Sequence, residues 1–437
     1  MQLIKSSNRK AGPVRVALAA ASASLLSGIQ VHADENPWLV DSAVLIYNES
    51  GGRVSATEPV VSLKKDMGDE HFLALKFTFD ALTGASPNGA IPSKQTITYT
   101  GTSGRSSYTT TVGKLPVDSF HDQRRAFGLN WDQPLGDNFH VSIGGDYSHE
   151  NDYQSNGLSA AIARDFNDKN TTLSLGVNLE EDSSNAIGGI PYAFSASSLT
   201  SRVASSENKN VHDILFGISQ VMSRNWLTQL NYSHSASTGY QNDPYKILSV
   251  LDSNGNTIAD PNNTSSSLWL HENRPDARNR QSIFWENKIH LTEDVIDVSL
   301  RHYSDDWGIK SETFDIRYRL EVGENSYFEP HFRYYTQNAA NFYRPFLVNG
   351  TDVINGISQL TYASSDPRLA KFTGNTFGLK WGYEIGRNSE FNIRVEKYDQ
   401  TGKSVPDAAK NMFALSGLNL YPGLSTQTVM VGYSFEF

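Results

Sequence analysis

Apolar and polar residues alternate along most of this chain with a period of two, the period at which side chains occupy the two faces of a β-strand. In the last segment one face is apolar and carries Val429, Val431, Tyr433 and Phe435. The alternation is also regular over 70–82, 123–133, 138–149, 169–181, 374–386 and 391–396. It is weaker over 39–48, 55–66, 153–166, 210–222, 225–236, 276–291, 294–304, 310–321 and 325–338. The pattern predicts an all-β protein of about sixteen strands.

The connections between these segments alternate between short turns and longer or more variable loops. The short turns mostly contain Gly, Asn or Asp and comprise 67–69, 134–137, 167–168, 223–224, 292–293, 322–324 and 386–388. The other connections comprise 49–54, 83–122, 150–152, 182–209, 237–275, 305–309, 339–369 and 401–423. Short periplasmic turns and long extracellular loops are typical of bacterial outer-membrane barrels. We therefore expect a single domain over residues 34–437, a transmembrane up-and-down antiparallel β-barrel with both ends in the periplasm.

The first 33 residues have the three regions of a secretory signal peptide in the usual order. The basic region contains Lys5, Arg9, Lys10 and Arg15 and no acidic residue. An apolar stretch follows over 16–29, and small residues at 31–33 offer a cleavage site before Asp34. The apolar stretch is too short for a transmembrane anchor, so we expect residues 1–33 to be removed.

Composition narrows the chemistry that the mature chain can perform. Removal of residues 1–33 takes away four basic residues and moves the formal net charge from −10 to −14. This acidity argues against a nucleic-acid partner, because phosphate binding needs a basic surface. The chain has no cysteine, which excludes a disulfide, a thiolate metal site and a thiol nucleophile. No mature segment has eighteen consecutive apolar residues, so a helical span is excluded as well.

Candidate catalytic and metal-binding residues are few, and no motif of useful specificity contains them. A barrel enzyme would place its catalytic groups at the outer rim, where the candidates are His149, His234, Asp305 and Asp306. The stretch of Asp252, Asn254 and Asn256 imitates the start of a calcium loop, but Thr257 and Asn263 stand where the Gly and the closing Glu should be. We expect a turn there, and we expect no catalytic activity, no bound metal and no cofactor.

The other strand face carries charges and is expected to line the lumen. A turn centred near Gly323 would set Arg317 opposite Glu329 and Asp315 opposite His331. The predicted lumen wall consists of Lys76, Asp80, Arg301, Asp315, Arg317, Arg319, Glu329, His331, Arg333, Lys380, Arg394 and Glu396. Such a wall is either a solvated surface of mixed charge or a selectivity surface, and it could also seat a plug.

Two features mark individual strands. Pro330 cannot donate to a β-ladder, so we expect a bulge there, or else a shorter strand that begins after it. The aromatic end of the last strand resembles the signal that outer-membrane barrels present to their assembly machinery, and it comprises Tyr433, Phe435 and Phe437.

Several stretches resemble an uncharacterised outer-membrane β-barrel family, domain of unknown function 3570. They are FDALTGASP at 79–87, GYQNDPYK at 239–246, SSDPRL at 364–369, and the segments 301–307 and 329–335. The resemblance covers the mature chain but carries no known chemistry, so it assigns no catalytic residue. It implies a genetic context with a small lipoprotein, a flavin-attaching transferase and thioredoxin-like proteins, and hence envelope redox chemistry or export. We interpret the motifs as turns that fold the loops inward; the alternative is a binding epitope on the cell surface.

These observations favour a passage protein of the outer membrane, a channel or export conduit. The loops 83–122, 237–275 and 339–369 are long enough to narrow or plug its lumen. The alternative is a non-conducting scaffold that holds a small lipoprotein or a periplasmic redox protein at the outer membrane. A surface enzyme is the third hypothesis. In each case the expected partners include outer-membrane lipids and the barrel-assembly machinery.

Overall fold

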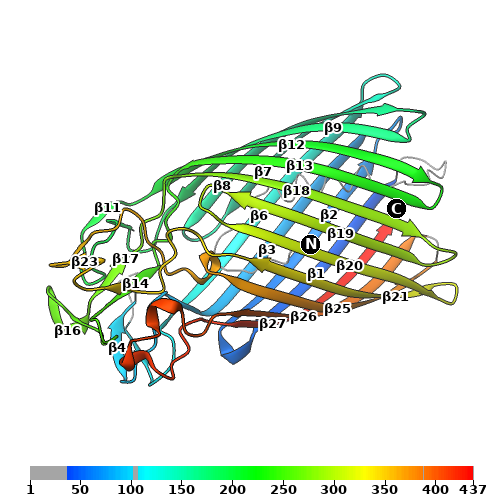
Figure 1. Cartoon of the computed structure of the whole chain (residues 1–437). Coiled ribbons are helices and arrows are strands. Elements are labelled where there is room, and N and C mark those ends of the chain that lie inside the picture. The colour runs from blue at the N-terminus through cyan, green and yellow to red at the C-terminus, as the bar shows by residue number, and fades with distance from the viewer. Residues whose placement is uncertain (1–36, 102–106, 387, 437) are drawn as a thin grey trace.

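The computed structural model describes residues 37–101, 107–386 and 388–436, so the expected signal peptide and Phe437 lie outside the described residues. Sixteen antiparallel strands pair in chain order and form a closed barrel (Figure 1). They are β1 (Trp38–Glu49), β2 (Val54–Asp66), β3 (Phe72–Pro87), β6 (Val117–Pro134), β7 (Phe139–His149), β8 (Tyr153–Phe166), β9 (Thr171–Ser184), β12 (Glu207–Ser223), β13 (Trp226–Gly239), β18 (Ala277–His290), β19 (Val295–Asp305), β20 (Lys310–Val322), β21 (Ser326–Gln337), β25 (Phe372–Glu384), β26 (Ser389–Gly402) and β27 (Leu424–Glu436). The predicted barrel of sixteen strands is confirmed.

The barrel closes where its first and last strands pair. The register runs from Leu39 opposite Glu436 to Glu49 opposite Thr426. Closure leaves no open strand edge, so every barrel strand exchanges hydrogen bonds on both sides.

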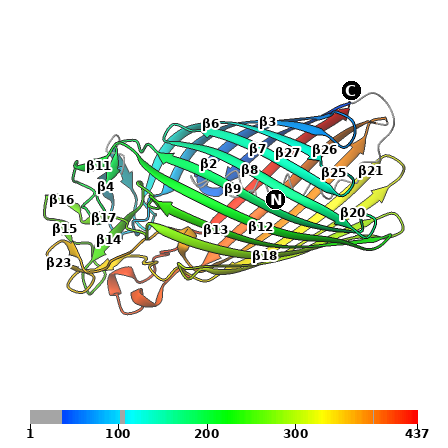
Figure 2. The same ribbon diagram turned by 90° about the horizontal axis from the view of Figure 1, so that it is seen from above.

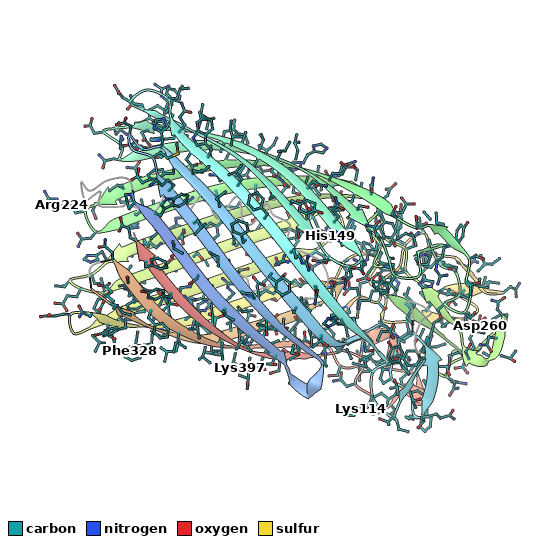
Figure 3. All side chains as sticks on the ribbon, turned by 180° about the vertical axis from the view of Figure 1, so that it is seen from behind. Lys114, His149, Arg224, Asp260, Phe328 and Lys397 are labelled. Atoms are coloured by element: carbon teal, nitrogen blue, oxygen red, sulfur yellow. The ribbon has the colours of Figure 1, made fainter. Side chains whose placement is uncertain are left out.

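The two ends of the barrel are unlike, as the alternating connections predicted. Short turns join the strands at one end, and the long connections gather at the other (Figures 1 and 2). Arg224 marks the turn end, whereas Lys114 and Asp260 mark the loop end (Figure 3). β27 begins after a long loop, so its last residue lies at the turn end. The start of β1 lies there as well, because Leu39 pairs with Glu436.

Side chains alternate between the outer surface and the lumen, as the pleat of a strand requires. The outer face of the barrel strands exposes many large apolar side chains, among them Phe77, Leu129, Leu158, Phe216 and Phe377. A continuous apolar surface of this extent is rare on soluble proteins and suits contact with lipid. Within the described residues, no helix is long and apolar enough to cross a membrane.

The long connections form a structure of their own, here called the loop cap: the described residues of 88–116, 185–206, 240–276, 338–371 and 403–423. A three-stranded sheet of β17 (Trp269–His271), β14 (Ile247–Leu251) and β22 (Leu347–Val348) lies at its centre. Small two-stranded sheets surround it: β4 (Ile97–Thr100) with β5 (Ser107–Thr110), β10 (Ile190–Pro191) with β11 (Arg202–Ala204), β15 (Ala259–Asp260) with β16 (Asn263–Ser267), and β23 (Val353–Ile354) with β24 (Ile357–Ser358). The short 3₁₀ turns are η1 (Ser50–Gly52) in the β1–β2 connection, and η2 (Pro367–Leu369), η3 (Asp407–Ala409) and η4 (Phe413–Leu415) in the loop cap.

An apolar core holds the loop cap together. Leu248, Val250 and Leu347 have no exposed surface, and Leu270 has almost none. A second cluster packs Leu251 and Phe346 against Met412 and Leu415 of the last loop. Burial of each such side chain stabilises a fold by about 1.5–3 kcal/mol. The two clusters therefore stabilise the folded conformation of the loop cap.

The β20–β21 hairpin departs from the predicted register by two residues. The expected pairs, Arg317 with Glu329 and Asp315 with His331, were wrong: the structure pairs Arg317 with His331 and Asp315 with Arg333. Val322 pairs with Ser326, so three residues form the turn and its centre is Glu324, one residue later than expected. A shift of two keeps every side chain on its predicted face.

Proline is accommodated differently from the expectation. The predicted bulge at Pro330 was wrong, because the register of β20 and β21 is the same on both sides of it. The alternative, a strand that begins after Pro330, was wrong as well, because β21 already begins at Ser326. The ladder simply lacks the two pairs opposite Tyr318 and Arg319. Pro59 has the same effect in β2, where the pairs of Glu58 and Pro59 with β3 are missing.

Candidate functional site: the charged lumen and the loop cap

All twelve predicted wall residues lie on the strand faces opposite the outer apolar side chains, which places them toward the lumen. His331 is central, since its Nε2 lies 3.0 Å from Asp315 and its Nδ1 lies 2.9 Å from Glu396. Arg333 lies 2.5 Å from Asp315 and Arg394 lies 3.0 Å from Glu329. Glu329, expected opposite Arg317, thus has a partner two strands away on β26.

The remaining wall residues form smaller groups. Asp80 pairs with Arg124 of the neighbouring β6, and Lys76 follows the same face of β3. Lys380 lies 3.2 Å from Glu390, and the Arg319 guanidinium lies 3.7 Å from the Tyr327 ring centroid. Arg301 stacks on Phe284, 5.1 Å from its ring centroid. The wall from β18 to β26 therefore combines cations and carboxylates in nearly equal measure.

The opposite side of the lumen is acidic. In a ring of sixteen strands β9 faces β26 and β7 faces β21, each eight strands away. The lumenal faces of β7, β9 and β12 carry Asp146, Glu180, Asp182 and Asp213. Lys209 pairs with Asp182 at 2.6 Å, and Ser155 donates a hydrogen bond to Glu180. The lumen thus has a mixed wall and an acidic wall across from it.

A cavity of about 650 Å³ lies at the loop end of the lumen, beneath the loop cap. Barrel strands form its sides, and the loop-cap residues 240–246 and 366–368 close it from above. Its lining includes nine Asp or Glu and four Lys or Arg side chains, a formal net charge of −5. The carboxylates are Glu49, Asp118, Asp122, Glu150, Asp152, Asp182, Glu207, Asp243 and Asp366, and the cations are Arg53, Lys209, Lys246 and Arg368.

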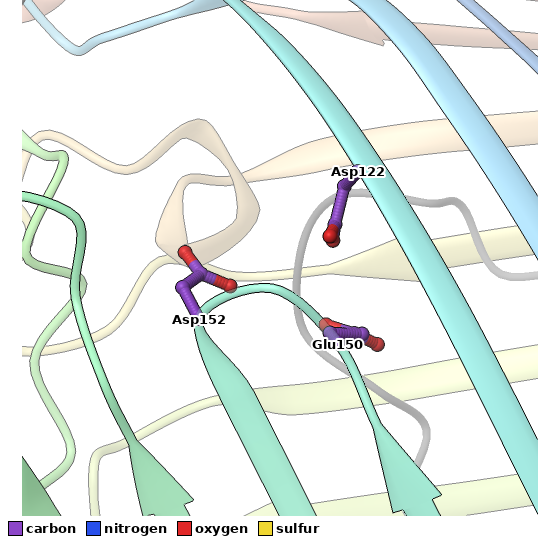
Figure 4. A group of neighbouring side chains, drawn as sticks. All are labelled: Asp122, Glu150 and Asp152. Atoms are coloured by element: carbon purple, nitrogen blue, oxygen red, sulfur yellow. The ribbon is translucent and has the colours of Figure 1, made fainter.

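Three carboxylates of this cavity lie around one space (Figure 4). Asp122 comes from β6, and Glu150 and Asp152 come from the connection between β7 and β8. One oxygen of each lies within 4.8 Å of the others, a spacing at which a cation could be held. The Tyr245 hydroxyl donates to Asp152 at 2.8 Å, and the Asn151 amide donates to Asp122 at 3.2 Å.

A buried ion network joins two of the family motifs at the base of the loop cap. Arg368, of the 364–369 motif, lies 2.9 Å from Asp243 of the 239–246 motif and also pairs with Asp366. Arg274 lies 2.8 Å from Asp366 and 2.7 Å from Glu272. The described side chains of these groups are largely buried, so charge pairing must offset the loss of hydration.

Further contacts tie this network to the barrel. Lys246 donates to the Pro87 carbonyl at 2.5 Å, which reaches the third motif at the end of β3. Ser365 donates to the Ile247 carbonyl at 2.6 Å, which connects the 364–369 motif to β14. The motifs 79–87, 239–246 and 364–369 therefore meet at one place, where the loops turn inward over the cavity.

Burial and pairing set the ionisation of the network. Burial alone would raise the pKa of Asp366, but Arg368 and Arg274 hold that pKa well below its usual range. Burial lowers the pKa of Lys246, against the opposing effect of Asp243 and Asp366. Burial also lowers the pKa of Arg368, but Asp366 and Asp243 outweigh it and raise that pKa. The carboxylate of Asp366 and the guanidinium of Arg368 are therefore charged throughout the physiological range.

The imidazole of His271 lies in the core of the loop cap, where none of the described residues forms a hydrogen bond with it. The residue is 2% exposed, and neither ring nitrogen is hydrogen-bonded. Burial, with a smaller contribution from Arg202, lowers the pKa of His271 to about 4. The imidazole is therefore neutral at pH 7.

The candidate catalytic residues are not brought together. His149 and His234 lie on the outer faces of β7 and β13, with three strands between them. Asp305 pairs with Arg278 in the lumen, whereas Asp306 accepts a hydrogen bond from Asn279. The absence of catalysis stays a prediction.

The expected turn at Asp252 is present. One carboxylate oxygen of Asp252 accepts from the amides of Asn254 and Asn256 at 2.9 and 2.8 Å, and Gly255 has a φ of +88°. At the chain end, Tyr433 and Phe435 stack at 5.5 Å between ring centroids. Their role as an assembly signal stays a prediction, and Phe437 lies outside the described residues.

Sequence reasoning missed the acidic wall and the carboxylates of the cavity. Glu180 and Asp182 continue the polar face of β9 past Asn178, so the strand alternation, followed a few residues further, could have found them. Glu150 and Asp152 carried no such signal, because they were expected in a loop of unknown path. Asp122 was likewise expected at the end of a long loop rather than within a strand.

The chain was compared with curated proteins and with solved structures. A comparison with curated proteins finds no match. Among solved structures the chain is similar to a bacterial polysaccharide outer membrane secretin, with 8% identity, 92% of this chain and 99% of that chain covered, and a TM-score of 0.43. It is also similar to the CymD monoaromatic hydrocarbon channel, with 7% identity, 98% and 94% covered, and a TM-score of 0.40. A third is OccK2 (OpdF) of Pseudomonas aeruginosa, with 10% identity, 92% and 98% covered, and a TM-score of 0.38.

At these identities and TM-scores, the likenesses say nothing about what the chain does. The sequence itself matches, over residues 15–435, the model of a family described as "Protein of unknown function (DUF3570)". The chain therefore belongs to the DUF3570 family, as the motifs at 79–87, 239–246 and 364–369 had indicated.

Proposed function

We propose that the protein is an outer-membrane channel for small hydrophilic solutes, preferably cations, and that the loop cap restricts it. The observation that carries the proposal is the cavity of about 650 Å³ in the lumen, whose lining has a formal net charge of −5. A lumen of this kind gives dissolved cations a favourable potential, and the charged wall supplies polar groups along the way.

The outer surface supports the membrane part of the proposal. Its exposed apolar side chains would contact lipid, and the closed ring of strands leaves no open sheet edge in hydrocarbon. The expected signal peptide, residues 1–33, would deliver the chain to the periplasm, and the short turns would face that compartment.

Planar-bilayer recording in a gradient of potassium chloride tests the proposal. We expect stepwise conductance and a reversal potential that indicates preference for K⁺ over Cl⁻. Combining Asp122→Asn, Glu150→Gln and Asp152→Asn should shift the reversal potential toward zero, because three negative charges leave the cavity. Asp407→Asn is the matched control, since that carboxylate is exposed in the loop cap and does not line the cavity.

Two results would contradict the proposal. No conductance from folded protein, with the loop cap intact and with it removed, would exclude a channel. Conductance with preference for Cl⁻ would contradict the role given to the acidic cavity.

A non-conducting scaffold is the second candidate, and one observation favours it. The loop cap exposes Phe413 at 85% and Ile357 at 68%, which suits contact with another protein. Purification from native membranes in mild detergent would then yield a stoichiometric small lipoprotein displayed at the cell surface, because the loop cap would lie at the end opposite the short periplasmic turns. A partner retained by the wild type and lost from Phe413→Ser with Ile357→Ser, together with absent conductance, would favour the scaffold over the channel.

A further inference from the structure

The outer face of the barrel has a hollow that is separate from the lumen and from the loop cap. Its volume is about 410 Å³, and it spans β2, β3, β6 and β7. Aromatic and aliphatic side chains dominate its lining: Val61, Phe77, Phe79, Phe127 and Tyr147. Pro59 also lines it, at the point where the ladder between β2 and β3 is interrupted.

Arg125 is the one charged residue among the described residues that line this hollow. It is exposed on the outer face of β6, where it pairs in register with Phe79 on one side and His149 on the other. Among the described residues, no side chain forms a hydrogen bond, an ion pair or a ring contact with its guanidinium. Two other outward cations differ: Lys397 lies 3.3 Å from Asp399, and Arg164 stacks on Phe139 and Phe166.

Arg125 lies where the outer face of β6 changes from apolar to polar side chains. Below it on the same face of β6 come Phe127, Leu129 and Trp131, all exposed. Above it, toward the loop end, come Gln123 and His121, which are polar. In a bilayer this level corresponds to the region between acyl chains and headgroups.

We infer that the hollow and Arg125 together bind one acyl lipid with a phosphate and a net negative charge, from the leaflet that surrounds the loop end. The phosphate would accept hydrogen bonds from the guanidinium, and one acyl chain would fill the hollow. A guanidinium matches a phosphate in charge and in hydrogen-bond geometry, and Phe79 and Tyr147 offer flat surfaces to a chain. The inference rests on the proposed membrane location, but it does not depend on conductance.

Native mass spectrometry of the detergent-solubilised barrel tests this site. The probes are dioleoyl phosphatidylglycerol, dioleoyl phosphatidylcholine with the same chains, and diphosphoryl lipid A. We expect wild-type protein to retain the anionic lipids in preference to phosphatidylcholine. Arg125→Gln should reduce retention of the anionic lipids about fivefold, since one interfacial cation contributes about that factor.

Three further variants make the test specific. Arg125→Lys should retain part of the preference for anionic lipid. Val61→Phe should lower retention of all three probes, because it fills the hollow without changing the charge. Arg164→Gln is the matched control, an outward arginine near the turn end that should leave retention unchanged. Circular dichroism verifies that each variant keeps its β-barrel.

The outcomes separate the two proposals. Retention of lipid A but not of phosphatidylglycerol would support the site and assign it to the glycolipid; the reverse would support it and assign it to phospholipid. Equal retention by wild type, Arg125→Gln and Val61→Phe would overturn the inference and leave the channel untouched. A barrel that conducts ions but shows no lipid preference would likewise overturn the lipid site and support the channel. Selective lipid retention without conductance would support the lipid site and overturn the channel.

Discussion

Arg368 is a single side chain that connects two loops over the lumen. Its guanidinium pairs with Asp243 from one loop and Asp366 from the other, and Asp366 in turn pairs with Arg274. Strand alternation predicted which residues of the barrel face the lumen, because that prediction needs only neighbours in sequence. The network could not be predicted in the same way, since Arg368 and Asp243 are 125 residues apart and nothing local specifies their contact.

Replacement of Arg368 by methionine should loosen the loop cap. The substitution removes one cation from two buried carboxylates, Asp243 and Asp366, and breaking a buried ion pair typically costs about 3–5 kcal/mol. Limited proteolysis should then cleave 240–276 much faster than in wild type, while the barrel strands stay protected. Lys403→Met is the control, because the ion pair of Lys403 with Asp407 is exposed and should contribute almost nothing. Equal cleavage of Arg368→Met and wild type would contradict the stabilising role of the network.

His271 should make the loop cap sensitive to mild acid. Its pKa is about 4 in the folded cap and near 6.5 in an unfolded chain. Between these values the unfolded state binds more protons, so stability falls as pH decreases from 6.5 to 4, by about 3 kcal/mol in total. Protease sensitivity of the cap should therefore rise between pH 7 and pH 5.

The variant His271→Phe isolates this effect. Phenylalanine fits a site where both ring nitrogens lack hydrogen bonds, and it cannot be protonated. The variant cap should be at least as stable as wild type at pH 7 and should lose the acid sensitivity above pH 4. An unchanged pH profile would mean that another group is responsible; Asp366 cannot be that group, because its contribution is lost only below pH 4.

At the scale of elements, sequence established the strands and their faces more reliably than their register. The β20–β21 hairpin was placed two residues out of register, because either Gly323 or Glu324 can stand at the centre of its turn. The length of β3 was also underestimated, since the motif at 79–87 continues as strand to Pro87 and pairs with β6 as far as Val117. Alternation says which face a residue occupies, but it gives no information on which partner it meets.

Engineered cysteines can measure this register, and the chain offers a clean background because it has none. The double variant Ile316→Cys with Phe332→Cys should oxidise to a disulfide, since these residues are directly opposed on the outer face. Phe314→Cys with Phe332→Cys should not, although the register expected from sequence would have opposed those two. A shift in mobility on non-reducing gels reports each crosslink, and crosslinking of the second pair alone would reject the register.

At the scale of the molecule, the loop cap and the barrel make different contributions. The barrel is held by its closed ladder, whereas the cap has its own apolar clusters around Leu248 and Leu251. Sequence predicted that the long loops could obstruct the lumen, but it could not predict a packed body, because the core residues come from five separate loops. The cavity beneath the cap exists only once both parts are in place.

Replacement of 243–272 by a short Gly-Ser linker should therefore increase single-channel conductance. The deletion removes β14 and β17 and, with Asp243 and Glu272, part of the ion network. The barrel should remain folded, as judged by circular dichroism and by its resistance to protease. Unchanged conductance in a folded variant would mean that the cap does not obstruct passage.

The pairing of β1 with β27 also has a consequence in time. Leu39 and Glu436 stand at opposite ends of the described chain, so their contact has the largest loop-closure cost of any barrel pair. Every earlier hairpin can form as soon as its two strands are available, but the ring cannot close before β27 arrives. Until then the growing sheet carries two open edges that could pair with any other strand. A cell that makes this protein must therefore keep those edges covered until the ring closes, and a chain cut short before Leu424 would never lose them.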